Sequence, residues 1–214
     1  MPETKSVVVL ISGGGSNLQA LIDCSESLGY HISAVISNKA GVYGLERAEH
    51  AGIPAETIPH TGYDDRNEFD QALVQQIDEY KPDLVVLAGF MRILGKEFVR
   101  HYLGRLLNIH PSLLPKYPGM HTHARALEAG DKQHGVSVHF VTEELDGGPV
   151  IAQARVNVLD GDTPETLASR VLEKEHLLYP QVVGWFCSGR LCMNNGRAQL
   201  DGQSLPATGL DFNG

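Results

Sequence analysis

Cysteine is scarce in this sequence of 214 residues, and that scarcity narrows the classes of protein to consider. The three cysteines, Cys24, Cys187 and Cys192, are odd in number and form no Cys-x-x-Cys pair. Disulfide-stapled domains and structural zinc sites need more cysteines at closer spacing. We therefore expect free thiols in a reducing compartment.

Long hydrophobic runs and excess positive charge are also missing. No stretch approaches the roughly 20 apolar residues of a membrane-spanning helix. The apolar run at 7–11 leads into glycines and not into a signal-peptide cleavage site. A net charge of −9 disfavours binding to nucleic acid or to an anionic membrane. We expect a cytoplasmic protein with small-molecule partners, either a monomer or a weak homodimer.

The hydrophobic content of 42% is enough for one α/β core. Apolar runs at 7–11, 32–36, 84–88 and 106–109 are typical of buried parallel strands, and segments with helical spacing separate them. The run 135–141 alternates in polarity, and 149–158 is its expected antiparallel partner. We predict a single α/β domain over 1–214, Rossmann-like, with a mostly parallel central sheet flanked by helices and an antiparallel hairpin extension in the C-terminal half.

A glycine-rich segment, Ser12–Asn17, joins the first strand to a helix. Glycine allows close approach of a ligand, and backbone amides at a helix start favour anions. The Gly-Lys-Ser/Thr of a Walker A loop is missing, and Leu18 stands where a dinucleotide fingerprint has its third glycine. We predict a monophosphate site on Gly13 to Asn17, with Ser16 and Asn17 as side-chain donors. The alternative is a tight turn without a ligand.

The strand at 106–109 is followed by a proline-rich loop that begins with His110. Asn108 and His110 are two residues apart, so their side chains point to the same side of a strand. Ligands of open α/β sheets bind at the carboxyl ends of the strands. The pattern predicts a hydrogen-bond donor beside a titratable imidazole. The alternative is a turn-capping Asn108 and an ordinary half-buried histidine.

Asp146 lies in an Asp-Gly-Gly segment between the two antiparallel strands. Asp-Gly is a hairpin-turn signal, so turn formation is one explanation for it. The functional alternative is a carboxylate that reaches His110, orients its ring and stabilises its protonated form.

Weaker candidates come from three other segments. Arg66 lies in the first turn of a helix capped by Asp64 or Asp65, which hints at an anionic partner but also fits a solvated arginine. The segment after Gly89 would line an apolar slot, with Arg92 holding an acid, or would simply pack in the core. Glu175 lies in a long helix and either touches substrate or belongs to a solvated face. The pair His121 and His123 lacks a third ligand at suitable spacing, so we expect no metal.

Four segments together resemble the folate-dependent formyltransferases: Ile11–Asn17, Ala88–Leu94, Asn108–Pro115 and Leu145–Pro149. The resemblance runs from about Val7 to about Leu205. The first segment ends in Gly-Ser-Asn, and this ending resembles that of the family branch whose acceptor is glycinamide ribonucleotide.

The resemblance implies an activity: transfer of the formyl group of 10-formyltetrahydrofolate to the amine of glycinamide ribonucleotide, in purine biosynthesis. It implies Asn108, His110 and Asp146 as catalytic residues and Glu175 as the contact to glycinamide. The remaining implied residues bind the substrate phosphate (Gly15, Ser16, Asn17) or folate (Arg66, Met91, Arg92, Ile93, Leu94, Asn108).

On this reading the domain has three parts. Residues 1–100 form a phosphate-binding half, 101–190 a catalytic and folate-binding half, and 191–214 a small hairpin with a loose tail. One departure is Gly14, where the family's pattern has a larger polar residue such as asparagine, so loop stiffness and phosphate affinity are expected to change. Two alternatives stay open: a hydrolase of 10-formyltetrahydrofolate, and a non-catalytic phosphate- or nucleotide-binding Rossmann-type module.

Overall fold

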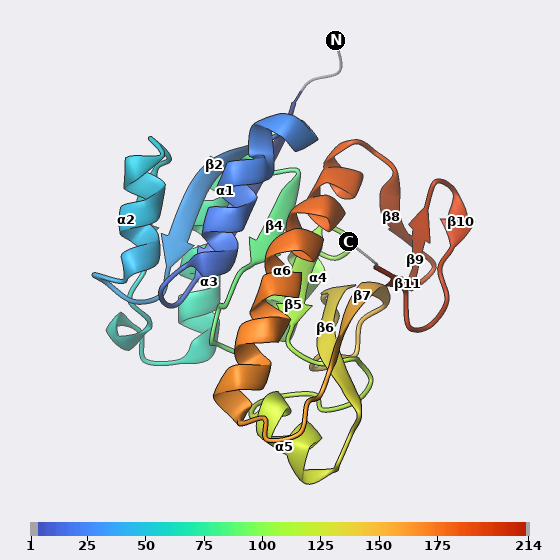
Figure 1. The fold of residues 1–214 in the computed structure, drawn as a ribbon. Coiled ribbons are helices and arrows are strands. Elements are labelled where there is room, and N and C mark those ends of the chain that lie inside the picture. Colours follow the sequence, from blue (N-terminus) through green and yellow to red (C-terminus); the bar gives the residue numbers. More distant parts are fainter. Residues whose placement is uncertain (1–3, 213–214) are drawn as a thin grey trace. The chain divides into compact units, whose positions relative to one another are not determined.

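The computed structural model describes residues 4–212, in which strands and helices alternate along most of the chain (Figure 1). The chain divides into two compact units, residues 1–107 and 108–214, and the division falls inside strand β5 (Leu106–His110). The elements before β5 are β1 (Lys5–Ile11), α1 (Ser16–Leu28), β2 (Tyr30–Ser37), α2 (Tyr43–His50), β3 (Ala55–Thr57), the 3-10 helix η1 (His60–Gly62), α3 (Arg66–Glu79), β4 (Leu84–Leu87) and α4 (Lys96–His101). The elements after it are α5 (Thr122–Glu128), β6 (Gln133–Phe140), β7 (Val150–Asn157), α6 (Pro164–Cys187), β8 (Leu191–Asn194), β9 (Arg197–Leu200), β10 (Gln203–Ser204) and β11 (Leu210–Asp211).

The first unit is built on a parallel sheet with the strand order β4-β1-β2-β3. Its centre is β1, where Val9 lies opposite Val35 on one side and opposite Val86 on the other. All three valines are fully buried, as expected for strands that are covered on both faces. The β-branched runs therefore form strands here because both faces of each residue pack against apolar neighbours.

Helix boundaries in the first unit follow recognisable signals. Gly29 ends α1 in the left-handed conformation, with φ of 72°. The Asp65 side chain caps α3 by accepting a hydrogen bond from the Glu68 amide. The parallel strands, the helix after the glycine loop and the cap of α3 are all as predicted.

The second unit contains an antiparallel pair, β6 and β7, with Val136 opposite Ala154. Helix α6 packs on both strands, and it starts at a capping box between Thr163 and Thr166. The predicted hairpin extension is confirmed. A separate antiparallel sheet, in the order β10-β9-β8, includes the hairpin predicted near residue 190.

Residues beyond Leu200 take part in two further pairings. Strand β10 pairs with β9, and β11 pairs in parallel with β7, where Leu210 lies opposite Ala152. Gly209, just before β11, has φ of 69°, and a Cβ there would lie 2.5 Å from the carbonyl carbon of Ile151. The sequence indicated a loose end, whereas the structure adds two short paired strands. The division of one domain into parts at 100 and 190 stays a prediction.

Candidate active site

The glycine-rich loop of the first unit turns the chain from β1 into α1. Gly15 precedes the helix with φ of 71°, and a Cβ at this position would lie 2.7 Å from Gly44 Cα. The Gly44 amide in turn donates a hydrogen bond to Gly13 O at 3.1 Å. Gly15 has no side chain with which to cap α1, so the first-turn amides suit an anion. Ser16 is half-buried and Asn17 is buried next to these amides.

Gly14 stands at the exposed tip of the same loop, and Arg47 holds it from α2. Nε of Arg47 donates to the Gly14 carbonyl at 2.8 Å, and its Nη1 donates to Gln19 Oε1 at 3.0 Å. The guanidinium also lies over the Tyr43 ring. A Cβ at Gly14 meets nothing within 4 Å, so a larger residue fits there. Sequence reasoning missed Arg47 because no signal in α2 distinguishes it from a solvated arginine.

The segment Met91–Leu94 follows β4 and exposes apolar side chains. Met91 is 65% exposed and Ile93 is 59% exposed. Core packing, the alternative explanation of this segment, is therefore wrong for these two residues. The Met91 amide donates to Ser12 Oγ at 2.8 Å, which ties the segment to the end of β1. Arg66 is exposed at the start of α3. The exposed apolar groups and the arginine both fit a ligand-binding role.

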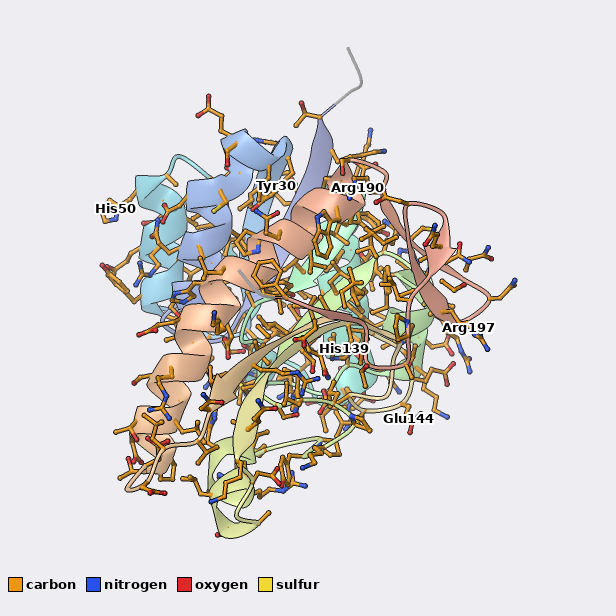
Figure 2. All side chains as sticks on the ribbon, turned by 45° about the vertical axis from the view of Figure 1, so that its right-hand side comes forward. Tyr30, His50, His139, Glu144, Arg190 and Arg197 are labelled. Carbon is orange, nitrogen blue, oxygen red and sulfur yellow. The ribbon has the colours of Figure 1, made fainter. Side chains whose placement is uncertain are left out.

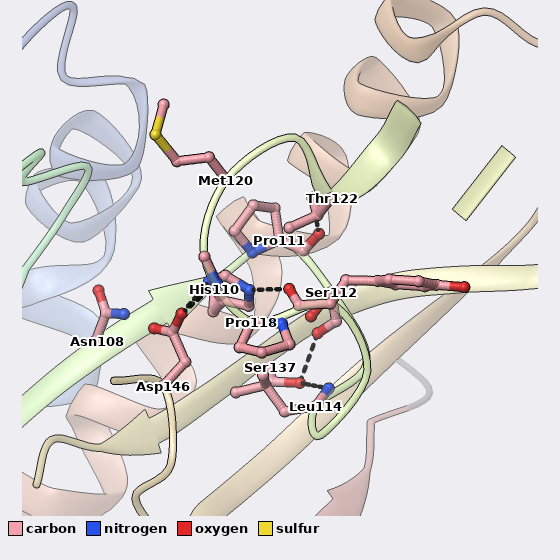
Figure 3. A network of polar contacts seen from close by, with 12 residues as sticks. Asn108, His110, Pro111, Ser112, Leu114, Pro118, Met120, Thr122, Ser137 and Asp146 are labelled. Carbon is pink, nitrogen blue, oxygen red and sulfur yellow. Dashed lines mark hydrogen bonds and ion pairs between the residues drawn. The ribbon is translucent and has the colours of Figure 1, made fainter. Parts of the chain in front are cut away.

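In the second unit, β5 delivers His110 to a buried position beside Asp146. His110 is 6% exposed, and its Nδ1 lies 3.5 Å from Asp146 Oδ2 (Figure 3). Its other ring nitrogen, Nε2, lies 2.9 Å from the Tyr117 carbonyl oxygen, and a carbonyl only accepts. Nε2 therefore carries a hydrogen, and Nδ1 faces the carboxylate. The structure thus brings together the histidine and the aspartate that were predicted from separate segments.

Asp146 is held in place by its own backbone and by a neighbouring amide. Its φ is 51°, and the Gly147 amide closes the turn on Glu144 O. The Gly119 amide donates to Asp146 Oδ2 at 2.8 Å. A side chain at Gly148 would place Cβ 1.8 Å from Phe140 O. The segment therefore both forms a turn and places the Asp146 carboxylate beside His110.

Asn108 contacts a second histidine of the site, His139, which lies inside the unit on β6 (Figure 2). His139 is 2% exposed, and its Nδ1 lies 2.9 Å from Phe140 O, so Nδ1 is the donor. Burial lowers the pKa of His139. The neutral ring then accepts from Asn108 Nδ2 at 3.2 Å through Nε2, which also lies 3.9 Å from Asp146 Oδ1. His139 thereby fixes which end of the Asn108 amide donates.

The proline loop after His110 is held by side chains of β6, β7 and α5 (Figure 3). Ser137 Oγ donates to Ser112 O at 2.7 Å and accepts from the Leu114 amide at 3.0 Å. Gln153 Nε2 donates to Leu114 O at 2.7 Å. Thr122 Oγ1 donates to Pro111 O at 2.6 Å. The loop that carries the Tyr117 carbonyl is therefore fixed at several points, which keeps His110 oriented.

Glu175 lies on α6 and is 8% exposed. The alternative that it belongs to a solvated face is therefore wrong. The burial of this carboxylate is compatible with a ligand contact.

Two groups at this site were missed from sequence, the Tyr117 carbonyl and the Gly119 amide, and the sequence assigned no definite role to the His139 ring. One signal was available for His139. Ser137 and His139 are two residues apart in an alternating strand whose other face is apolar, so both side chains point to one polar side. The two backbone groups have no sequence signal, because any residue supplies them.

Comparisons with known proteins identify the family of the chain. A family model described as formyl transferase matches residues 5–183. Phosphoribosylglycinamide formyltransferase of Escherichia coli is 58% identical over 206 residues, which cover 95% of this chain and 97% of that protein. The protein of the same name from Haemophilus influenzae is 46% identical over 207 residues, 96% of this chain and 98% of that one.

A solved structure gives the same result for the fold. Phosphoribosylglycinamide formyltransferase from Coxiella burnetii, solved in complex with CHES, is 55% identical, with a TM-score of 0.94 over 98% of this chain and 100% of that chain. The predicted fold class, with its mostly parallel sheet and flanking helices, is confirmed. Because the family model spans most of the chain and these relatives match it almost end to end, the chain belongs to the formyl transferase family.

Proposed function

We propose that this chain transfers the formyl group of 10-formyltetrahydrofolate to the amine of glycinamide ribonucleotide, giving formylglycinamide ribonucleotide for purine biosynthesis. The observation that carries the proposal is the buried pair of His110 and Asp146 next to an Asn108 whose amide is oriented by His139. This chemistry fits a chain that is 58% identical to a phosphoribosylglycinamide formyltransferase.

The reaction needs an oxyanion donor, a positive charge and a path for one proton. The amine attacks the formyl carbon, and the carbonyl oxygen becomes an oxyanion in a tetrahedral intermediate. Asn108 Nδ2 has two hydrogens, of which one is donated to His139. The second is the donor that we assign to the oxyanion. Protonated His110 supplies the positive charge, and Asp146 stabilises it.

The proton moves from the attacking amine to N10 of folate as the carbon–nitrogen bond to N10 breaks. Nε2 of His110 is committed to the Tyr117 carbonyl at 2.9 Å. Nδ1 has a longer contact, to Asp146 Oδ2 at 3.5 Å. We therefore assign Nδ1 as the nitrogen that gives and takes the proton. The mechanism needs no covalent enzyme intermediate and no metal.

Substrate binding falls to residues outside this group. We assign Gly15, Ser16 and Asn17 to the substrate phosphate, since they open α1 without a side-chain cap on Gly15. Glu175 is assigned to the glycinamide amine, because a buried carboxylate suits a cationic or donor group. The folate contacts assigned are Arg66, Met91, Arg92, Ile93, Leu94 and Asn108.

We further propose that the reaction takes place in the cytoplasm, on a monomer or weak homodimer. Among residues 4–212, no helix is both long enough and apolar enough to cross a membrane. The proposed partners are the two small-molecule substrates alone.

A formyl-transfer assay tests the function. 10-Formyltetrahydrofolate is mixed with the protein, with and without glycinamide ribonucleotide, and the folate product is followed. We expect tetrahydrofolate to form only when the ribonucleotide is present. Release of formate without the ribonucleotide would instead make the protein a hydrolase, and binding without any turnover would make it a phosphate-binding module.

A further inference from the structure

A buried carboxylate on α3 lies among the groups that we assign to folate. Asp70 is 5% exposed, although an aspartate on a surface helix ordinarily faces solvent. Burial raises the pKa of its carboxyl group, whereas the Gly95 amide and the charges of Arg66 and Arg92 act in the opposite direction. The two arginine charges are thus close enough to influence Asp70, and both belong to the proposed folate contacts.

Asp70 fixes the end of the segment that carries Arg92. Its Oδ2 accepts a hydrogen bond from the Gly95 amide at 2.6 Å. Gly95 is the N-cap of α4 and directly follows Leu94. A Cβ at Gly95 would lie 2.8 Å from Asp70 Oδ2 and 3.8 Å from Arg66 Cδ. Asp70, Arg66 and the end of the segment 91–94 therefore all lie close to Gly95, where there is no space for a larger residue.

Arg92 packs against Phe69, the residue that precedes Asp70 on α3. Its guanidinium carbon lies 5.1 Å from the centre of the Phe69 ring. Arg92 Nε and Asp70 Oδ1 are both buried, and neither has a hydrogen-bond partner among the described residues. The ring face thus holds the guanidinium next to the position of Asp70 and leaves hydrogen-bonding capacity at Nε unused.

We propose that Asp70 is a positioning residue that holds Arg66 and Arg92 for the carboxylate end of the folate co-substrate. The proposal rests on the proposed function. Two guanidinium groups that serve one ligand repel each other, and the negative charge of Asp70, which attracts both, offsets part of that repulsion. An arginine binds a carboxylate best in a fixed two-bonded geometry, so orientation matters as much as charge.

Asp70→Asn tests the role with little change in shape. The amide oxygen still accepts from Gly95, so the cap of α4 is kept, while the negative charge is lost. KM and kcat are measured with 10-formyltetrahydrofolate and with the N-methylamide of 10-formyltetrahydropteroate, which lacks both glutamate carboxylates. The assays contain moderate salt, because salt screens the general attraction between anionic folate and an uncompensated arginine.

The matched control is Asp78→Asn. Asp78 lies on the same helix and also holds the region of α4, through His101 Nε2 at 2.8 Å and the Tyr102 hydroxyl at 2.9 Å. Twelve residues of α3, about 18 Å of helix rise, separate Asp78 from Arg66, so the charge of Asp78 acts far less on that arginine than the charge of Asp70 does. Loss of helix packing alone is therefore expected to affect both variants alike.

For Asp70→Asn we expect KM for 10-formyltetrahydrofolate to rise about tenfold, as for one lost charge-assisted contact, with KM for the methylamide and kcat nearly unchanged. Asp78→Asn should leave the ratio of the two KM values unchanged. Equal effects on both substrates would show a purely structural role and overturn the proposal. An unchanged or lower KM for 10-formyltetrahydrofolate would show that Asp70 only weakens the attraction between the arginines and the anionic folate. That result would also overturn the proposal.

The assay also separates this proposal from the proposed function. If the unsubstituted protein turns over neither substrate, the proposed function fails. Calorimetry then measures the dissociation constants of tetrahydrofolate and of tetrahydropteroate N-methylamide for the unsubstituted protein and for Asp70→Asn. A loss of affinity for tetrahydrofolate alone supports the role of Asp70, and an equal loss for both compounds overturns it. A protein that binds neither compound overturns both proposals.

Discussion

Two histidines a few ångströms from the same carboxylate make different hydrogen bonds. His110 gives its Nε2 hydrogen to the Tyr117 carbonyl and turns Nδ1 toward Asp146. His139 gives its Nδ1 hydrogen to the Phe140 carbonyl, and burial lowers its pKa, which favours the neutral ring. Proton transfer is the role that we propose for His110, whereas the neutral ring of His139 is an acceptor for Asn108.

Asn108→Ala removes the donor that we assign to the oxyanion. We expect kcat to fall by about a hundredfold or more, the usual cost of one oxyanion donor. Because Asn108 is half-buried and contributes no core packing, the thermal unfolding midpoint should change little. Steady-state kinetics and a melting curve check both parts. Near-normal turnover in the folded variant would remove Asn108 from the mechanism.

His139→Leu and His139→Gln separate orientation of the amide from packing. Leucine fills part of the volume but accepts no hydrogen bond, so the Asn108 amide loses its fixed orientation. We expect kcat to fall about tenfold for leucine, and less for glutamine, whose side-chain oxygen accepts. Equal losses in the two variants, measured at equal folded fraction, would show that His139 acts only through packing.

At the scale of elements, the turn from β1 into α1 contains two adjacent glycines with different requirements. Gly15 has φ of 71° and no room for a Cβ, whereas Gly14 has open space around it. We expect Gly15→Ala to lower the free energy of unfolding by about 2 kcal/mol, from backbone strain and the clash with Gly44.

Gly14→Ala is the matched control, with an expected change within about 0.5 kcal/mol. Denaturant unfolding of the two variants checks the difference. Similar losses for both would mean that the loop does not need its left-handed residue. Gly14→Asn, which restores the residue typical of the family's pattern, should also fold normally.

The elements were predictable where local chemistry determines them. Runs such as Val7 to Ile11 are apolar on both faces, so only a buried strand accommodates them. Thr163 with Pro164 starts a helix by capping and by fixed φ, and the structure agrees. The pairing of β11 with β7 was not predictable, since two residues carry no periodicity and the pairing depends on long-range contact.

For the molecule as a whole, buried histidines couple stability to pH. Burial lowers the pKa of His134 to about 4, with further effects from His123, Asp131 and His110. The unfolded chain, with an ordinary value of 6.5, binds more protons between these two pH values. The stability from a neutral His134 is therefore fully present above about pH 6.5 and is lost as the pH falls toward 4.

This coupling predicts that the free energy of unfolding falls as the pH is lowered from 7 to 4.5. Burial also lowers the pKa of His123 and of His139, so all three groups act in the same direction. In His134→Gln the slope against pH should be shallower, whatever the variant loses in absolute stability. Denaturant titrations at several pH values measure it. An identical slope in the variant would rule out His134 as a source.

The candidate site was predictable as separate residues but not as an arrangement. Asn108 and His110 share a side of β5 because strands alternate, which sequence alone gives. The meeting of Asp146 with His110 depends on a left-handed turn and on the Gly119 amide, neither of which has a sequence signal. Burial of Glu175 was likewise hidden, because it depends on how α6 packs in the folded chain.

The most direct test of the account is a single turnover followed by mass spectrometry of the ribonucleotide. Excess protein, 10-formyltetrahydrofolate and glycinamide ribonucleotide are mixed, and the reaction is stopped at successive times. We expect the ribonucleotide to gain one formyl group in step with formation of tetrahydrofolate, the protein mass to stay unchanged, and Asn108→Ala to slow the step about a hundredfold or more. Formate release without a formylated ribonucleotide, or a formylated protein, would contradict it.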